Sequence, residues 1–320
     1  MNDCCFVCPI YMKERDYNFA LDLYESKLKN AISVPLYFVF SYETHKTKFM
    51  ECFYQKFGFE YQDGILVPEN FLQYKCQVTT KKLYAVKKLQ SQFKYIAVID
   101  CECLFIKNAD IYGTFSEIWD RKSFMVSNKS YLLQPLLKIC VEELALKNKR
   151  QIKKDTENYV YNCWFNDIPV YSTEYTEEFF TWLEKQNVAR ILNNYYMVDF
   201  YIYLLFLMDI HDFKITKLNE WAPLGIMEEL AYTHTEKAND IEKQIGTHWT
   251  SNGNSQNEQA IMLFHRDHSP NKKETEDFVS YAKMRYYFGR LTFNSRKAAS
   301  LFNHISIKLW KTKYFRKYRW

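Results

Sequence analysis

The amino-acid sequence predicts an α/β protein: a mixed, mainly parallel sheet flanked by helices, with a basic helical tail at the C-terminal end. The order of strand and helix patterns carries this prediction, and the composition adds that the chain is well packed. Short apolar, β-branched runs alternate with helical patterns of about 12 to 15 residues, the order of repeated βαβ units whose strands run parallel. Gly and Pro number only seven each, so few loops of the chain can be built on these two residues.

The first part of the chain alternates strands with helices. Apolar runs predict strands at residues 4–11, 34–41, 65–69 and 95–99. Apolar residues at helical spacing predict helices at residues 13–30, 45–58 and 79–93. The second helix is expected to end at Gly58, because glycine adopts the left-handed conformation of a helix end easily. Thr79 is expected to cap the third helix, because its hydroxyl can accept a backbone N–H.

The pattern loosens after residue 108. A strand is predicted at residues 123–127 and a helix from residue 132. The basic, polar stretch at residues 147–158 is interpreted as a mobile loop or an insertion. The remaining predicted elements are, in order, a strand-like segment to Pro169, a helix capped by Ser172 or Thr173, an apolar helix that continues to Met208, and a strand at residues 260–264.

Several classes of protein are disfavoured by the sequence. Neither GxGxxG nor GxxxxGK[ST] occurs, which argues against dinucleotide-binding and P-loop sites. Nine scattered cysteines without framework spacing are typical of reduced thiols in a cytosolic protein. The N-terminus shows no secretory-signal pattern. The longest apolar run, residues 195–210, is interrupted by Asp199 and is too short to span a bilayer, so it is interpreted as a buried helix.

An acidic pair follows the predicted strand at residues 95–99. Asp100 and Glu102 lie one residue apart, and side chains at i and i+2 of an extended chain point to the same side. Carboxylates are hard oxygen ligands suited to Mg²⁺ or Mn²⁺ that carries a diphosphate. Ligands of parallel sheets bind at the carboxyl ends of the strands, which favours a site here. The alternative is a strand that runs into an acidic turn.

Three features together resemble the GT-A class of glycosyltransferases: a strand that ends in an acidic pair, a lysine-bearing helix before it, and a late strand that ends in His. In that class a DxD motif holds a divalent metal on the diphosphate of a sugar nucleotide. The resemblance implies a GT-A-like, Rossmann-like fold with Mn²⁺ or Mg²⁺ held by Asp100, Glu102 and His265, with His268 as the alternate to His265. Glu102 departs from the motif, whose second acid is usually Asp.

The resemblance also implies a division of the chain. Residues 1–285 would form the catalytic domain, with a nucleotide-binding half at 1–127 and an acceptor half at 128–285. Residues 286–320 would form a separate basic, aromatic tail. Within residues 303–320, six Lys or Arg and no acid interleave with aromatic residues. That composition suits an anionic membrane surface; a nucleic-acid partner is less favoured, and a solvated terminal helix is the remaining alternative.

Further candidate residues surround the acidic pair. Lys81 and Lys82 could stabilise the charge of a departing diphosphate, although exposed lysines are usually only solvated. The carboxyl-end rule assigns Tyr11 and Arg15, after the first strand, to the base or ribose of the nucleotide.

An inverting transfer would also need a carboxylate that takes the proton of the acceptor hydroxyl. Asp167, Glu228 and Glu229 lie in predicted loops and are the candidates for this role. The alternative for each of them is a surface acid or a helix cap.

The sequence therefore predicts a metal-dependent glycosyltransferase of bacterial surface polysaccharide synthesis, such as lipopolysaccharide or capsule. It would use a nucleoside-diphosphate sugar and a glycan or lipid-linked acceptor, in the cytoplasm or on the inner face of the cytoplasmic membrane. Two alternatives stay open: a nucleotidyltransferase or metal-dependent phosphohydrolase that uses the same acidic strand end, and a non-catalytic binding module.

Overall fold

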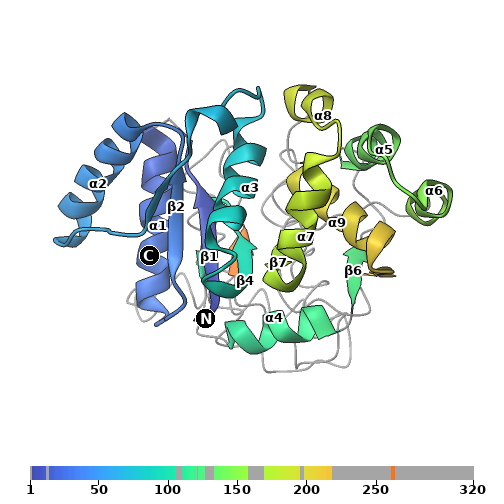
Figure 1. Cartoon of the computed structure of the whole chain (residues 1–320). Helices are drawn as coiled ribbons and strands as arrows, with labels where there is room; N and C mark the ends of the chain where they lie inside the picture. Colours follow the sequence, from blue (N-terminus) through green and yellow to red (C-terminus); the bar gives the residue numbers. More distant parts are fainter. Residues whose placement is uncertain are drawn as a thin grey trace, which may run out of the picture.

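A five-stranded sheet lies at the centre of the protein, in the strand order β3-β2-β1-β4-β7 (Figure 1). The structure is a computed structural model that describes residues 2–11, 14–105, 110–120, 122–126, 133–157, 169–194, 198–217 and 261–263. The strands are β1 (Asn2–Pro9), β2 (Leu36–Phe40), β3 (Gly64–Leu66), β4 (Phe93–Val98) and β7 (Val170–Ser172). The first four are parallel and β7 is antiparallel to β4. The mixed, mainly parallel sheet predicted from the sequence is confirmed.

Helices connect the parallel strands as crossovers. These helices are α1 (Glu14–Lys29), α2 (Glu43–Phe57) and α3 (Gln77–Leu89), with a short 3₁₀ turn, η1 (Glu69–Phe71), before α3. The chain moves from β1 to β2 to β3 in one direction and then returns past β1 to β4. Since such connections are right-handed, α1 and α2 cover one face of the sheet and α3 covers the other.

The three predicted helix ends have different outcomes: Gly58 is confirmed, Thr79 is wrong, and Ser172 is the N-cap residue of α7 but makes no capping hydrogen bond with its side chain. Gly58 ends α2 with φ of 75°, and its N–H donates to the carbonyl of Tyr54 at 2.8 Å. Thr79 does not cap α3, because the helix begins two residues earlier with Cys76 at the N-cap position. Thr79 is instead buried and accepts a hydrogen bond from the Cys76 thiol at 3.2 Å.

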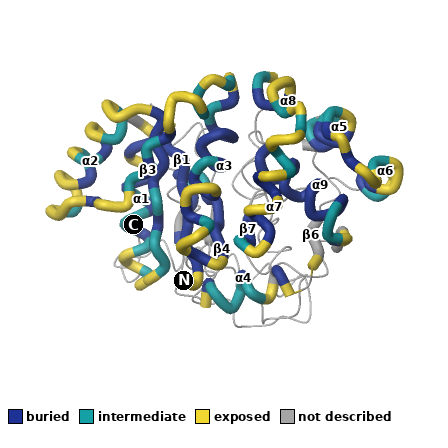
Figure 2. The backbone as a smooth tube through the Cα atoms, viewed as in Figure 1, coloured by how far each residue is buried: buried dark blue, intermediate teal, exposed yellow. Residues whose placement is uncertain are grey.

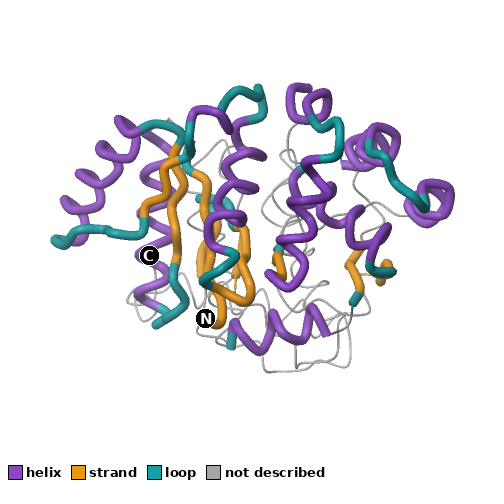
Figure 3. Tube along the Cα trace, viewed as in Figure 1, coloured by secondary structure: helices purple, strands orange, loops and turns teal. Residues whose placement is uncertain are grey.

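Helices predominate in the second part of the described chain (Figure 3). They are α4 (Ile111–Asp120), α5 (Leu133–Glu143), α6 (Lys149–Glu157), α7 (Thr173–Glu184), α8 (Ala189–Asn194) and α9 (Asp199–Ile210), and β6 (Ser123–Val126) pairs in parallel with β8 (Lys214–Lys217). Residues 199–209 of α9 are all buried, as predicted for this apolar run. Within the described ranges, no helix has the length and apolar character that a membrane crossing requires.

The interpretation of residues 147–158 as a mobile loop is wrong over the part that the structure describes, because residues 149–157 form α6; the alternative, an insertion, stays a prediction. Ile152 and Thr156 are buried and form the inner face of α6. The other side chains of residues 149–156 are half-buried or exposed (Figure 2). Asp209 of α9 accepts hydrogen bonds from the backbone N–H groups of Lys147 at 3.0 Å and Asn148 at 2.7 Å. A cap supplied from a distant helix cannot be recognised from the local sequence.

The acidic pair lies in a turn and not on a continuous strand. β4 ends at Val98, and the N–H of Cys103 donates to the carbonyl of Asp100 at 3.0 Å to close the turn. A new strand, β5 (Cys103–Phe105), then pairs antiparallel with β9 (Ile261–Leu263). The premise that Asp100 and Glu102 alternate along one extended strand is therefore wrong.

Candidate functional site

The carboxyl ends of β1 and β4 lie side by side at one edge of the sheet. The two strands pair in parallel, with Val7 opposite Val98, and the N–H of Ile99 donates to the carbonyl of Val7 at 2.9 Å. Tyr11 and Asp100 follow these strand ends directly. Ligands of open parallel sheets bind at this edge, so it is the candidate functional site.

Lys82 reaches this edge from α3. Its side chain is 1% exposed, and its Nζ lies 3.3 Å from Oδ1 of Asp100, whose side chain is 21% exposed. A buried ammonium needs an anionic partner, because transfer of an unpaired charge out of water is costly. The solvated lysine pair, which was the alternative on sequence grounds, is excluded by this burial.

Lys81 reaches the end of the neighbouring strand. It is also 1% exposed, and its Nζ donates to the carbonyl of Ile10 at 2.6 Å and lies 4.8 Å from the ring centroid of Tyr11. Burial lowers the pKa of Lys81 from 10.5 to about 8, the neighbouring charge of Lys82 lowers it further, and the carboxylate of Asp16 opposes the shift. Lys81 thus binds the backbone where β1 ends, while Lys82 binds the carboxylate where β4 ends.

The position of α3 explains why both lysines point to the same edge. A crossover helix runs antiparallel to the strands that it connects, so its N-terminal turns lie at their carboxyl ends. Long side chains of a helix lean toward its N-terminus, which carries the lysine heads toward the same edge. α3 also packs between the sheet on one side and α7 and α9 on the other, and both lysine stems are therefore buried.

The turn after β4 presents two acids around a buried cysteine. Asp100 and Glu102 are half-buried, whereas Cys101 is 7% exposed. Burial raises the pKa of the Cys8 thiol well above its usual value, and the charges of Asp100 and Glu102 raise it further. Both carboxylates therefore lie close to the end of β1.

The donors at this turn fit part of a divalent-metal site. Two carboxylates supply the hard oxygen atoms that Mg²⁺ and Mn²⁺ prefer. Among the described residues, however, no group of three or more His, Cys, Asp or Glu could hold a metal ion. A metal at Asp100 and Glu102 would need further ligands from outside these residues, from the substrate or from water.

Arg15, a further predicted site residue, lies at the start of α1. Arg15 lies 3.3 Å through its Nε from Oδ1 of the buried Asp16, and its guanidinium lies 5.8 Å from the ring centroid of Phe19. Only residues 10–13 separate the end of β1 from the start of α1, so this helix start lies at the carboxyl end of the sheet. The charge of Asp16 also raises the pKa of Lys81 and of the Cys101 thiol. The structure therefore brings Tyr11, Arg15, Lys81, Lys82, Asp100 and Glu102 to one edge of the sheet.

The remaining predicted residues lie outside the described ones. These are Asp167, Glu228, Glu229, His265, His268 and the tail at residues 286–320. One neighbouring contact is described: Leu263, two residues before His265 in the sequence, pairs with Cys103, the residue after Glu102.

One residue at this edge was not assigned a role from the sequence. Asp199, at the first position of α9, is 1% exposed, and its Oδ2 accepts a hydrogen bond from the hydroxyl of Tyr171 at 3.3 Å. Burial raises the pKa of Asp199; the charge of Lys82 lowers it and the charge of Asp100 raises it. The available signal was its place as a lone acid near the start of a long apolar run.

Comparison with known proteins yields structural likeness only. No protein-family model and no curated protein matches the chain. Mouse xyloside xylosyltransferase 1, in its apo form, aligns with 83% of this chain and 99% of its own, at 9% identity and a TM-score of 0.45. The galactosyltransferase LgtC, in complex with donor and acceptor sugar analogues, aligns with 91% of this chain and 98% of its own, at 11% identity and a TM-score of 0.41.

Core-mannan synthase A from Aspergillus fumigatus, in a Mn/GDP form, aligns with 70% of this chain and 76% of its own, at 10% identity and a TM-score of 0.34. The first two structures are glycosyltransferases by name, the class that the sequence resembles. At these identities and TM-scores, the likeness assigns neither a family nor an activity to the chain.

Proposed function

We propose that the protein is a glycosyltransferase that moves a sugar from a nucleoside-diphosphate sugar to a glycan or glycolipid acceptor with the help of Mn²⁺ or Mg²⁺. The observation that carries the proposal is the pair of buried lysines beside two carboxylates at the carboxyl edge of the sheet. Lys82 lies 3.3 Å from Asp100, and Lys81 holds the end of β1. A structural role alone would not require two ammonium groups in a core at this edge.

The two lysines suit the charge that develops during such a transfer. A nucleoside diphosphate that leaves a sugar gains negative charge, and preformed cations stabilise this charge without having to reorganise. Lys82 and Lys81 are held by Asp100 and by the carbonyl of Ile10, so their positions are set before a substrate binds. When bound, a divalent cation would add electrostatic stabilisation of the same diphosphate.

Asp100 and Glu102 are the proposed metal ligands, and His265 is proposed as a third. β9 ends at Leu263, which pairs with Cys103 next to Glu102. His265 comes two residues after Leu263 in the sequence, and two residues of extended chain span at most about 7 Å. The pairing of Leu263 with Cys103 therefore supports His265, which is nearer to Leu263 in the sequence than the alternate His268.

We also propose residues that contact the nucleotide and a carboxylate that takes the proton of the acceptor. Tyr11 and Arg15 are proposed to meet the base or ribose, since both follow the end of β1. Tyr11 is 45% exposed, and Lys81 Nζ lies 4.8 Å from the centroid of its ring. Asp167, Glu228 and Glu229 are the proposed carboxylates for the proton of the acceptor hydroxyl, if the transfer inverts the configuration.

Titration calorimetry tests the donor site directly. UDP and GDP are titrated into the protein with and without Mn²⁺, and we expect at least one of them to bind about tenfold more tightly with the metal. Asp100→Asn and Glu102→Gln should each remove this metal effect, whereas Glu142→Gln, a change of an exposed acid on α5, should leave it intact. If Mn²⁺ makes no difference to either nucleotide and Asp100→Asn changes nothing, the proposal is wrong.

The products distinguish the alternatives. A glycosyltransferase releases a nucleoside diphosphate from sugar nucleotides in the presence of Mn²⁺, slowly to water and faster to an acceptor. A nucleotidyltransferase would instead consume nucleoside triphosphates and release pyrophosphate. Chromatography of both reaction mixtures separates these outcomes.

The cellular role is the finer part of the proposal. We place the enzyme in bacterial lipopolysaccharide or capsule synthesis, with residues 1–285 as the catalytic domain and residues 286–320 as a tail that docks on the inner face of the cytoplasmic membrane. The support is the composition of residues 303–320, because each Lys or Arg near an anionic surface contributes about 1 kcal/mol. Equal sedimentation with anionic liposomes by the chain with and without residues 303–320 would contradict the docking.

A further inference from the structure

The carboxylate of Asp199 is only half satisfied by hydrogen bonds. Its Oδ2 accepts from Tyr171 at 3.3 Å, but its Oδ1 is buried without a hydrogen-bond partner among the residues that the structure describes. The side chain as a whole is 1% exposed. A buried, unsatisfied carboxylate oxygen is costly, and its presence calls for an explanation, of which a functional role is one.

Lys82 is a positively charged residue whose charge acts on Asp199. α3, which carries Lys82, packs against α9, which begins with Asp199. The positive charge of Lys82 acts on the Asp199 carboxylate, and so does the negative charge of Asp100. Lys82 thus lies within the electrostatic reach of two carboxylates while its described ion pair is with Asp100.

Metal binding would change the partner that Lys82 needs. If Asp100 uses its oxygens for a divalent cation, as proposed above, the repulsion between metal and ammonium weakens the pair of Asp100 with Lys82. Lys82 is 1% exposed and cannot turn to bulk water without leaving the core. A carboxylate oxygen that can accept the ammonium at a similar depth is Oδ1 of Asp199, which has no hydrogen-bond partner among the described residues.

We propose that Asp199 is a positioning residue that receives the Lys82 ammonium when Asp100 binds a divalent cation. The flexible stem of lysine and its three N–H donors allow it to serve a carboxylate and a diphosphate oxygen together. Tyr171 fixes the other oxygen of Asp199, so the acceptor stays in place while the lysine moves. This inference rests on the proposed function, because it requires Asp100 as a metal ligand.

Asp199→Asn tests the proposal, because asparagine keeps the shape of the side chain and removes its charge. Without the second carboxylate, Lys82 competes with the metal for Asp100, so we expect the affinity for Mn²⁺, measured by calorimetry in the presence of UDP or GDP, to fall about tenfold. The matched control is Asp209→Asn, a second buried acid on α9 that binds backbone N–H groups of residues 147 and 148. The control should change Mn²⁺ affinity less than about twofold, within the range of independent sites.

A double variant separates positioning from a general structural effect. In a Lys82→Met background no ammonium competes for Asp100, so Asp199→Asn should then change Mn²⁺ affinity by less than about twofold. An equal loss with and without Lys82 would overturn the proposal, since Asp199 would then act independently of the lysine. Unchanged affinity in the single variant would also overturn it.

A crystal structure with Mg²⁺ and the tighter-binding nucleotide gives a readout that does not need the double variant to fold. Lys82 Nζ within hydrogen-bond distance of Asp199 Oδ1 supports the proposal, and Lys82 still paired with Asp100 overturns it. A different result would show that the proposed function itself is wrong: Asp100→Asn would then leave the effect of Mn²⁺ on nucleotide binding intact. A normal effect of Asp100→Asn with no effect of Asp199→Asn rejects only the positioning role.

Discussion

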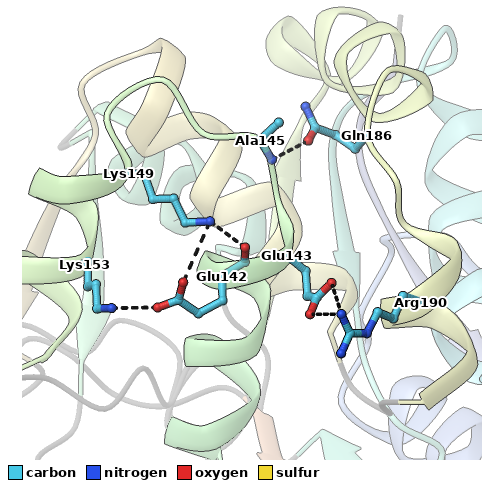
Figure 4. Close-up of polar contacts among 7 residues, drawn as sticks. All are labelled: Glu142, Glu143, Ala145, Lys149, Lys153, Gln186 and Arg190. Atoms are coloured by element: carbon cyan, nitrogen blue, oxygen red, sulfur yellow. Dashed lines mark hydrogen bonds and ion pairs between the residues drawn. The ribbon is translucent and has the colours of Figure 1, made fainter.

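Two pairs of lysines on two helices of this protein have opposite environments. Lys81 and Lys82 of α3 are each 1% exposed and bind a carbonyl and a carboxylate at the edge of the sheet. Lys149 and Lys153 of α6 are 37% and 45% exposed, and both pair with Glu142 of α5 (Figure 4). Arg190 and Gln186 make similar surface contacts to Glu143 and to the backbone of Ala145.

The difference separates exposed charges that connect neighbouring helices from buried charges to which the proposed function assigns a ligand. An exposed ion pair gains little, because water solvates both partners nearly as well when they are apart. A buried ammonium is costly even when it is paired, and a hydrophobic residue of similar volume often serves stability better. Under the proposed function, the buried charges of Lys81 and Lys82 serve a diphosphate at the sheet edge, whereas the α6 lysines only connect neighbouring helices.

The largest expected effect is on catalysis at α3. Lys82→Met should lower kcat/KM for a sugar nucleotide by about 100- to 1,000-fold, the range seen when one preorganised charge-stabilising group is removed. Lys153→Met, the matched change on α6, should leave kcat/KM unchanged. Rates are measured as nucleoside diphosphate release with Mn²⁺, on variants whose thermal unfolding is cooperative. Equal rates for the two variants would remove the functional distinction between the lysine pairs.

The next effect is the dependence of stability on pH. The pKa of Lys81 is lowered from 10.5 to about 8 in the folded protein, so between these values the folded state binds fewer protons than the unfolded state. The free energy of unfolding of the wild type, relative to Lys81→Met, should therefore rise as the pH increases from 8 to 10.5, by up to about 3 kcal/mol. Below pH 8 the difference should be constant.

Urea titrations at pH 7, 8 and 9.5 measure this difference for the two proteins. The comparison between variants is needed because buried cysteines such as Cys8, whose pKa is raised, contribute the opposite slope in both proteins. A difference that falls with pH, or that does not change, would show that the Lys81 ammonium is not disfavoured by burial.

A smaller effect is expected where α9 caps α6. Asp209 is 5% exposed and accepts two backbone hydrogen bonds at the start of α6. Asp209→Ala should lower the free energy of unfolding by about 2 kcal/mol, the upper range for loss of a helix cap. Nucleotide binding with Mn²⁺, measured by calorimetry, should not change. A loss of nucleotide binding would show that the packing of α6 and α9 affects the site, and it would weaken the contrast between the two regions.

The smallest effect is expected at the surface of α6. Lys153 pairs with Glu142 at 2.7 Å, and both side chains are well exposed. Lys153→Ala should leave the midpoint of thermal unfolding within experimental error, at low and at high salt, because exposed pairs are screened and solvated. Differential scanning calorimetry at two salt concentrations checks this. A clear drop in the midpoint of thermal unfolding would mean that the surface ion pairs between α5 and α6 stabilise the protein.

The elements that could be predicted are those whose signals are local. The strand patterns, the glycine end of α2 at Gly58 and the buried helix that ends at Ile210 all follow from periodicity and residue type. The turn at Asp100 to Cys103 was left open as the alternative to a continued strand, and the cap of α6 by Asp209 was not predicted. Both depend on partners that the local sequence does not specify.

The sequence by itself determined the βαβ order, and with it the place of Asp100 after a parallel strand at the edge where ligands bind. It did so because apolar spacing dictates which faces are buried and parallel strands align their ends. Only the tertiary structure decided that Lys81 and Lys82 are buried and that Asp199 joins them. Burial of a charge depends on what packs over it, and here α7 and α9 come from segments about a hundred residues away in the chain.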